Sequence, residues 1–301
     1  MINLNNFEYL VGDKHISKKP TQPYSEIVYN FLGDLSDELN LSTSSKNYAD
    51  IKTLAFWCRK KNIYNLKKNF LSNETRLGLG LIFHITPSNI PTNFAYSLIF
   101  GLVTGNSNIV KVPSQKFEQV KIICKAINKI LKNKYKTIRK MISIVRYSNN
   151  DNYTKKISSM CNARIIWGGD NSISNIRKFE LNQRALDIAF ADRYSFCVLN
   201  TLEILKINNT QMQRLIEKFY NDTYLVDQNA CSSPHLILWL GKRANRARKK
   251  FWKYLFNYVN RKYNLTETAS IEKYTQLCSH ILSLKNMKKY ERYGNSIYTI
   301  Q

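Results

Sequence analysis

Long hydrophobic runs are missing from this sequence of 301 residues. The most apolar stretch, Phe94 to Val103, is far shorter than the ~20 residues that a membrane-spanning helix needs. The first residues, Met1 to Glu8, lack the basic and then apolar regions of a signal peptide. We therefore expect a protein without a membrane span that resides in the reducing cytoplasm.

Closely spaced cysteine pairs are also missing. The six cysteines are spread along the chain without a CxxC unit, at positions 58, 124, 161, 197, 231 and 278. They do not form the dense framework of a small secreted domain, and we expect no structural zinc or other metal site. The chain has 44% hydrophobic residues, enough for a real core, and its length predicts two domains or one large α/β unit.

Acidic residues are few. The 21 Asp and Glu stand against 46 Lys and Arg, which gives a formal net charge of +25 and raises nucleic-acid binding as a hypothesis. The basic residues are scattered, however, so nucleic acid is not the expected partner. The exception is the segment Lys242 to Lys250, followed by Phe251-Trp252. It is typical of a solvated basic helix with an aromatic anchor, and binding of an acidic surface or of coenzyme A phosphates stays open.

Alternating apolar patterns predict an α/β fold. Residues 23–72 favour helices, since Ile27, Phe31 and Leu35 keep one face together. Strand-like runs lie at 79–85, 108–112, 141–146, 164–167, 195–199 and 235–240, and further helical segments lie at 114–131 and 211–220. Thr210 is the expected N-cap of the last helical segment. The alternation predicts a mostly parallel sheet with helices on both faces.

One cysteine lies outside any apolar run. Cys231 is set among small polar residues in the segment Asp227 to Pro234, between a helical segment and an apolar strand. A cysteine kept for packing normally lies inside an apolar run, as Cys124 does. The segment is typical of a nucleophilic thiol, but a structural thiol is an equal alternative, because reactivity depends on the local pKa.

A loop bracketed by two prolines follows the strand-like run 79–85. Pro87 and Pro91 restrain the backbone around Asn89 just beyond the carboxyl end of that run, where α/β sheets bind ligands. An amide held there could donate a hydrogen bond to a developing oxyanion, a contact worth about 3 to 4 kcal/mol. The alternative, which the segment alone favours, is that Asn89 caps the next helix.

Five blocks together resemble the aldehyde dehydrogenase superfamily, and within it the LuxC-type acyl-CoA reductases that supply aldehyde in bacterial luminescence. The blocks are FHITPSNIPTNFAY (83–96), GNSNIVKVPS (105–114), WGGD (167–170), DRYS (192–195) and the segment around Cys231. Their order and spacing agree with the family, with 22 positions from Asn89 to Lys111 and 57 from Lys111 to Gly168. The resemblance implies an aldehyde-dehydrogenase-like fold and reduction of a long-chain acyl thioester to an aldehyde.

The resemblance also implies a division of the chain. Residues 1–75 would form a helical region on the cofactor domain, 76–193 a Rossmann-like NAD(P)-binding domain, and 194–301 a partial catalytic domain with the nucleophilic cysteine. Only 70 residues follow Cys231, fewer than the family has, and we find no counterpart of the carboxylate that holds the nicotinamide ribose. We therefore expect a catalytic domain shortened at its C-terminus, which leaves full turnover open.

The catalytic roles follow from the same resemblance. The Cys231 thiolate would attack the acyl thioester, Asn89 and the Cys231 backbone N–H would stabilise the oxyanion, and NADPH would deliver the hydride. Family members that release a free acid carry a glutamate base, and aligning Ser195 with the serine downstream of it puts Phe190 in its place. A phenylalanine cannot activate water, which disfavours aldehyde oxidation. His235 is a candidate base, although a strand histidine is the favoured interpretation.

The cofactor residues are implied in the same way. Lys111 matches the lysine that reaches the ribose and phosphate of an adenine nucleotide. Ser114 stands where NAD-preferring members carry a glutamate, which leaves room for a 2′-phosphate and favours NADP. Gly168 and Gly169 would let a pyrophosphate approach the amides of a helix N-terminus, although a plain turn is the alternative. Asp170 is the expected cap of that helix.

The competing hypothesis is a non-catalytic binding protein. It would use the dinucleotide fold and the basic segment around Arg246 to dock an acyl-transferring partner or nucleic acid, and it predicts no covalent acyl intermediate. The acyl donor, coenzyme A or a carrier protein, is not distinguished by the sequence. A protein partner that transfers the acyl group and a homo-oligomer are both compatible with the resemblance.

Overall fold

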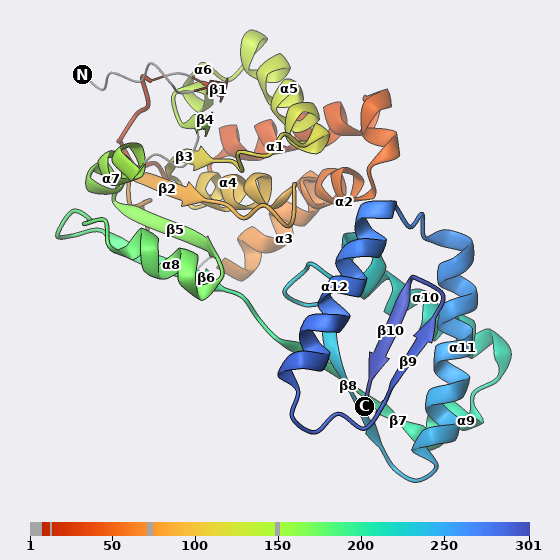
Figure 1. The fold of residues 1–301 in the computed structure, drawn as a ribbon. Coiled ribbons are helices and arrows are strands. Elements are labelled where there is room, and N and C mark those ends of the chain that lie inside the picture. The colour runs from red at the N-terminus through yellow and green to blue at the C-terminus, as the bar shows by residue number, and fades with distance from the viewer. Residues whose placement is uncertain (1–7, 13, 71–74, 148–150) are drawn as a thin grey trace. The chain divides into compact units, whose positions relative to one another are not determined.

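The computed structural model describes residues 8–12, 14–70, 75–147 and 151–301 (Figure 1). Residues 71 and 72 of the predicted helical stretch 23–72 lie outside this description. The chain forms two compact units, Met1–Asp192 and Arg193–Gln301. The first unit contains both the predicted helical N-terminal region and nearly all of the predicted cofactor domain.

The first unit is built on a six-stranded sheet in the order β1-β4-β3-β2-β5-β6 (Figure 1). Its strands are β1 (Glu8–Val11), β2 (Leu81–Ile85), β3 (Ser107–Lys111), β4 (Ile142–Arg146), β5 (Ala163–Gly168) and β6 (Leu186–Ala191). Strands β2 to β6 pair in parallel, and β1 joins the edge antiparallel to β4. Every residue of β2 is buried, as expected for a parallel strand covered on both faces. The mostly parallel α/β sheet predicted from the sequence is confirmed.

Helices cover both faces of this sheet. They are α1 (Glu26–Leu41), α2 (Ala49–Trp57), α3 (Lys60–Phe70), α4 (Asn93–Val103), α5 (Glu118–Asn133), α6 (Lys136–Arg139), α7 (Asp151–Met160) and α8 (Asp170–Arg177), with a 3₁₀ turn η1 (Thr43–Asn47). Val110 of β3 packs in one core with Leu98 of α4 and Ile127 of α5. Its neighbour Ile109 packs in the opposite core with Ile157 of α7. Successive strand side chains therefore enter different cores, as the two-residue period requires.

The second unit combines two small sheets with helices. Its strands β7 (Ser195–Asn200) and β8 (Pro234–Leu240) pair in parallel, and β9 (Tyr290–Tyr293) pairs antiparallel with β10 (Ile297–Ile300). Its helices are α9 (Thr201–Lys206), α10 (Asn209–Thr223), α11 (Ala244–Lys262) and α12 (Glu267–Ser283), with a 3₁₀ turn η2 (Tyr224–Val226). Met212 and Ile216 of α10 pack on Phe251 and Leu255 of α11. This unit therefore has a core of its own.

One predicted helix boundary is wrong. The N-cap of α10 is Asn208 rather than Thr210. The Asn208 side chain accepts a hydrogen bond from the Gln211 backbone N–H, and the Gln211 side chain accepts one from the Asn208 N–H. This reciprocal capping box satisfies two backbone donors at once, which a cap at Thr210 would not do. Within the described residues, no helix has the length and apolar character needed to span a bilayer.

Candidate active site

The carboxyl end of β2 lies at the topological switch point of the sheet, because β3 and β5 flank β2 on opposite sides. Thr86 fixes the loop that follows, since its Oγ1 donates to the Lys111 carbonyl oxygen at 2.8 Å. Asn89 is exposed in this loop. The N-cap of α4 is Thr92, three residues later, so the interpretation of Asn89 as a helix cap is wrong. The chain makes a turn through Pro91 before the helix begins, which leaves Asn89 outside it.

Lys111 and Ser114 both contact Tyr147, a residue that the sequence analysis missed. The Lys111 Nζ lies 5.0 Å from the ring centroid of Tyr147, and the Ser114 Oγ donates to the Tyr147 carbonyl oxygen at 3.4 Å. Burial lowers the pKa of Lys111. Tyr147 directly follows β4 and is only 3% exposed. An aromatic residue one position beyond a predicted strand was the signal that could have found it.

The glycine pair lies where β5 gives way to α8. Gly168 ends the strand, and Gly169 is the N-cap of the helix. A Cβ at Gly169 would meet nothing within 4 Å, whereas one at Gly168 would touch the Ser172 side chain at 3.4 Å. Asp170 is the first residue of α8 rather than its cap, so that prediction is wrong, because the strand conformation continues only as far as the glycines. The open space at Gly169 fits a phosphate group at the helix N-terminus.

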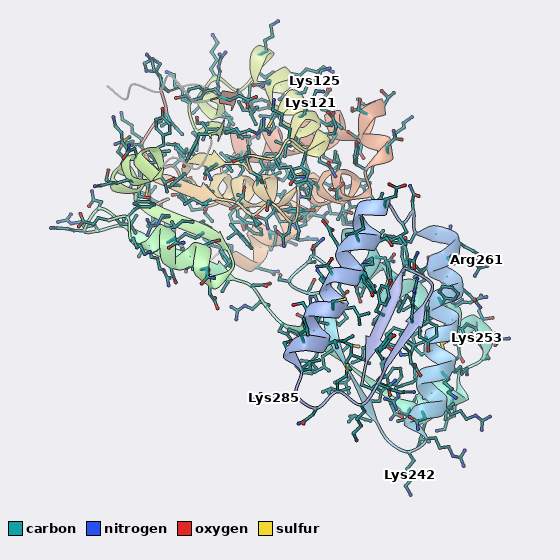
Figure 2. The ribbon with its side chains drawn as sticks, in the orientation of Figure 1. Lys121, Lys125, Lys242, Lys253, Arg261 and Lys285 are labelled. Atoms are coloured by element: carbon teal, nitrogen blue, oxygen red, sulfur yellow. The ribbon has the colours of Figure 1, made fainter. Side chains whose placement is uncertain are left out.

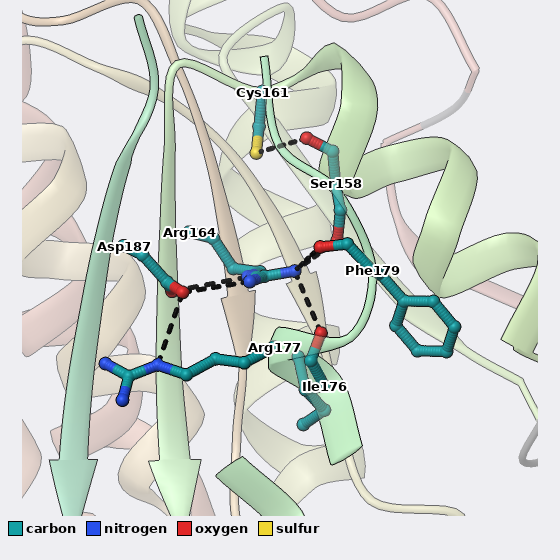
Figure 3. Close-up of polar contacts among 7 residues, drawn as sticks. All are labelled: Ser158, Cys161, Arg164, Ile176, Arg177, Phe179 and Asp187. Atoms are coloured by element: carbon teal, nitrogen blue, oxygen red, sulfur yellow. Dashed lines mark hydrogen bonds and ion pairs between the residues drawn. The ribbon is translucent and has the colours of Figure 1, made fainter. Parts of the chain in front are cut away.

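A buried arginine, also missed by the sequence analysis, holds α8 against the sheet (Figure 3). Arg164 of β5 is 1% exposed, and its guanidinium donates two hydrogen bonds to the Asp187 carboxylate, at 2.9 and 3.3 Å. It also donates to the Ser158 hydroxyl and to the carbonyl oxygens of Ile176 and Phe179, at 2.9 to 3.1 Å. These bonds join α7, the end of α8, and strands β5 and β6. The turn at the other end of α8 is thereby fixed relative to the sheet.

A network of hydrogen bonds and one stacked ring pair hold Phe190, the residue that the alignment puts in place of the glutamate base. His84 bonds to the Ser97 hydroxyl at 2.8 Å through Nδ1 and to Asn108 at 2.9 Å through Nε2. The indole N–H of Trp167 donates to the same Ser97 hydroxyl at 3.1 Å. The Trp167 ring stacks on Phe190, with centroids 4.1 Å apart and an interplanar angle of 14°. The hydrogen bond from Trp167 to Ser97 fixes the indole, and the indole in turn fixes the Phe190 ring by stacking.

Cys231 belongs to the second unit, in the loop before β8. Its side chain is exposed, and its carbonyl oxygen accepts a hydrogen bond from the Ser195 hydroxyl at 2.6 Å. The Ser233 hydroxyl donates to the Asp222 carbonyl oxygen at 2.6 Å. His235 lies on β8, and its ring stacks on Tyr194 with centroids 5.6 Å apart. The interpretation of His235 as a strand histidine is confirmed.

The basic segment Lys242–Lys250 leads into and opens helix α11, as predicted. The Phe251 side chain is fully buried, which confirms the aromatic anchor. Lys250 is structural, because its Nζ donates to the carbonyl oxygens of Ile204 and Ile207 at 2.9 Å and so caps α9. The exposed basic side chains of the segment are those of Lys242, Arg243, Arg246 and Lys249, whereas that of Arg248 is half-buried. Figure 2 shows Lys242 extending away from the body of the unit.

The predicted site residues therefore fall into three groups. Asn89 and the glycine pair follow the neighbouring strands β2 and β5 at the same edge of the sheet. Lys111 and Ser114 meet at Tyr147, after β3 and β4. Cys231 lies in the second unit, on a loop whose backbone is tied to β7 through Ser195.

Comparison with protein families decides the relationship. The model of the acyl-CoA reductase family LuxC matches residues 28–271. The chain belongs to this family. Comparison with curated protein sequences gives no match.

Solved structures show the aldehyde dehydrogenase fold. Aldehyde dehydrogenase 21 from Physcomitrella patens, in complex with the reaction product succinate, matches with a TM-score of 0.62 at 11% identity, over 90% of this chain and 62% of that one. Salicylaldehyde dehydrogenase from Pseudomonas putida G7 matches with a TM-score of 0.61 at 11% identity, over 92% and 62%. An indole-3-acetaldehyde dehydrogenase with NAD+ matches with a TM-score of 0.57 at 13% identity, over 91% and 59%. This LuxC-family chain thus spans 59 to 62% of the length of these structures.

Proposed function

We propose that the protein reduces a fatty acyl thioester to an aldehyde through an acyl group carried by Cys231. The observation that carries the proposal is the exposed Cys231 thiol on a hydrogen-bonded loop, in a chain of the LuxC acyl-CoA reductase family. The cysteines of the first unit, in contrast, are all buried, namely Cys58, Cys124 and Cys161. Their thiols are less accessible to an acyl donor.

Acyl transfer is the first step of the proposal. The Cys231 thiolate attacks the carbonyl carbon of the donor, a new C–S bond forms, and the bond to the donor sulfur breaks with release of the donor thiolate. The Cys231 backbone N–H, on the same loop as the thiol, donates to the carbonyl oxygen as it gains negative charge. A preorganised donor of this kind contributes about 3 to 4 kcal/mol to the transition state. Coenzyme A and an acyl-protein thioester are both donors that this step accepts.

Four residues fit a nicotinamide dinucleotide and are proposed to bind NADPH. Gly169 opens on free space at the first turn of α8, and Gly168 leads into it. Lys111 presents an ammonium at the end of β3, and Ser114 carries no charge that would repel a 2′-phosphate. When bound, the nicotinamide supplies the hydride that converts the acyl group to an aldehyde and frees the thiolate.

Phe190 supports reduction over oxidation to a free acid. Aligning Ser195 with the serine downstream of the glutamate base of acid-releasing aldehyde dehydrogenases puts Phe190 in the place of that base, and the Phe190 ring is stacked on Trp167. A hydrocarbon ring accepts no proton from water, so hydrolysis of the acyl group on Cys231 has no base at this position. The acyl group therefore persists until it is reduced.

Intact-mass measurement tests the proposal directly. The purified protein is incubated with acyl-CoAs of different chain length, then chased with NADPH or NADH. We expect an acyl adduct on the wild type and on the matched variant Cys278→Ala, none on Cys231→Ala, and loss of the adduct with NADPH. An adduct that survives in Cys231→Ala contradicts the assignment of the nucleophile.

The same measurement separates a second candidate function. The exposed basic residues on and before α11, among them Lys242 and Lys253 (Figure 2), favour a binding module that docks an acidic acyl-transferring partner. Such a module forms no covalent adduct. A wild-type protein that stays unacylated with every donor would favour this function over the reductase.

A further inference from the structure

The chain is strained immediately before the Cys231 loop. Asp227 and Gln228 are consecutive non-glycine residues in the left-handed region, with φ values of 50° and 60°. Each such residue costs on the order of 1 to 3 kcal/mol and persists only where surrounding contacts fix it. These two residues turn the chain from η2 into the segment that carries Cys231.

Two side chains from later elements form hydrogen bonds with the Asp227 carboxylate. Its Oδ1 accepts hydrogen bonds from the Tyr263 hydroxyl at 2.7 Å and from the Lys273 Nζ at 2.6 Å. The Lys273 side chain is 17% exposed, and its Nζ lies 5.7 and 5.6 Å from the ring centroids of Tyr224 and Tyr263. The ammonium thus meets a carboxylate and two aromatic faces in a partly desolvated place, which strengthens both kinds of contact.

The two tyrosines link this cluster to the body of the unit. Burial, with the hydrogen bond to Asp227, raises the pKa of Tyr263, so its phenol stays protonated and donates. The Tyr224 hydroxyl donates to the Ser296 carbonyl oxygen at 3.2 Å, at the turn between β9 and β10. The anchor of Asp227 therefore rests on residues from η2, the end of α11, α12 and the last hairpin.

The loop beyond Asp227 is closed by further hydrogen bonds. The Gln228 N–H donates to the Thr223 carbonyl oxygen at 2.6 Å, and its side-chain amide donates to the Pro234 carbonyl oxygen at 2.9 Å. Ser195 holds the carbonyl oxygen of Cys231 between these points. A side chain that fixes Asp227 therefore also fixes the backbone of the loop that carries Cys231.

We propose that Lys273 is a positioning residue that, together with Tyr263, holds the Cys231 loop in its reactive conformation through Asp227. This inference deepens the proposed function and rests on it for the role of Cys231. Lys273 does not act on the acyl group. Its role is to keep the thiol and the neighbouring backbone in the geometry that acyl transfer needs, where an error of about 1 Å can cost about 100-fold in rate.

Three variants test this assignment. Lys273→Met removes the ammonium and keeps the length of the chain, and Lys273→Arg keeps the charge. Lys289→Met is the matched control, because Lys289 forms an ion pair of similar length, 2.7 Å, with Glu291 on β9 in the same unit. Each protein is assayed for acylation of Cys231 by an acyl-CoA and, separately, for alkylation of Cys231 by iodoacetamide with peptide mapping.

We expect Lys273→Met to lower the acylation rate by about 10- to 100-fold, with the alkylation rate near that of the wild type, because alkylation needs only an accessible thiolate. Lys273→Arg should recover most of the acylation rate, and Lys289→Met should match the wild type. Acylation of Lys273→Met at the wild-type rate overturns the inference. Equal losses in both reactions also overturn it, since they indicate a general loss of structure.

Hydrogen exchange separates failure of this inference from failure of the proposed function. The Gln228 N–H is hydrogen-bonded to the Thr223 carbonyl oxygen at the end of α10, and the Ser233 N–H to the Ala230 carbonyl oxygen, so both amides report on the order of the loop. Faster exchange of both in Lys273→Met, with unchanged exchange in the α10 and α11 core, supports the inference even where the wild type is not acylated, an outcome that rejects only the proposed function. Unchanged exchange in the loop rejects the inference by itself.

Discussion

Burial controls the protonation of His84. His84 is fully buried, and burial lowers its pKa to about 4 from the usual 6.5. Between these two pH values His84 binds a proton in the unfolded chain but stays neutral in the folded chain. The contribution of neutral His84 to the free energy of unfolding is therefore fully present above pH 6.5 and is lost progressively as the pH falls towards 4.

We expect this histidine to remove about 3 kcal/mol from the free energy of unfolding between pH 7 and pH 4. In His84→Gln the dependence on pH should be weaker by that amount, because an amide does not titrate. Urea unfolding at several pH values measures the effect. His280→Gln is the control, since His280 is exposed, and it should follow the wild type. A stability difference between His84→Gln and wild type that stays constant with pH would contradict the argument.

The junction of β5, β6, α7 and α8 depends on one buried guanidinium. Arg164→Met would remove five hydrogen bonds and leave the Asp187 carboxylate with Arg177 alone, at 3.4 Å (Figure 3). We expect a loss of about 3 kcal/mol in the free energy of unfolding by urea. Arg177→Met, which removes a half-exposed partner of the same carboxylate, should cost at most about 1 kcal/mol. Similar losses in the free energy of unfolding of the two variants would show that the buried hydrogen bonds of Arg164 contribute no more to stability than the half-exposed ion pair of Arg177.

Elements with a clear apolar pattern could be predicted from the sequence, and elements without one could not. Strands β2, β3 and β4 are short apolar runs, and their predicted positions differ from the observed ones by one or two residues. Strand β6 was missed, because its alternation of Leu186, Asp187 and Ile188 lies within a chain that carries many mixed segments of this kind. The start of α10 was misplaced because Asn208 and Thr210 are both good caps, and only the geometry with Gln211 decides between them.

Across the whole molecule, the candidate site could be predicted where it follows from topology. Asn89 was placed just beyond one strand-like run and Gly168 at the end of another, and the parallel pairing of β2 with β5 brings both to the same edge of the sheet. Contacts between positions far apart in the sequence could not be predicted. Lys273 reaches Asp227 across 46 residues, and no local pattern encodes such a pair. These long-range contacts are also the ones that hold the predicted residues in place.

The two units have separate hydrophobic cores, so a mutation in one should open that unit alone. The first unit packs on its parallel sheet, and the second packs α10 on α11. Leu255→Ala in α11 removes a side chain that is 1% exposed and should cost about 2 to 5 kcal/mol.

Hydrogen exchange followed by mass spectrometry can locate the effect. In Leu255→Ala, amides of α10 and α11 should exchange faster, whereas amides of β2 and β5 should keep their wild-type rates, because opening occurs in cooperative units that follow the packing. Arg164→Met should give the reverse pattern. Faster exchange in both units from either single change would mean that the chain unfolds as one cooperative body despite its two cores.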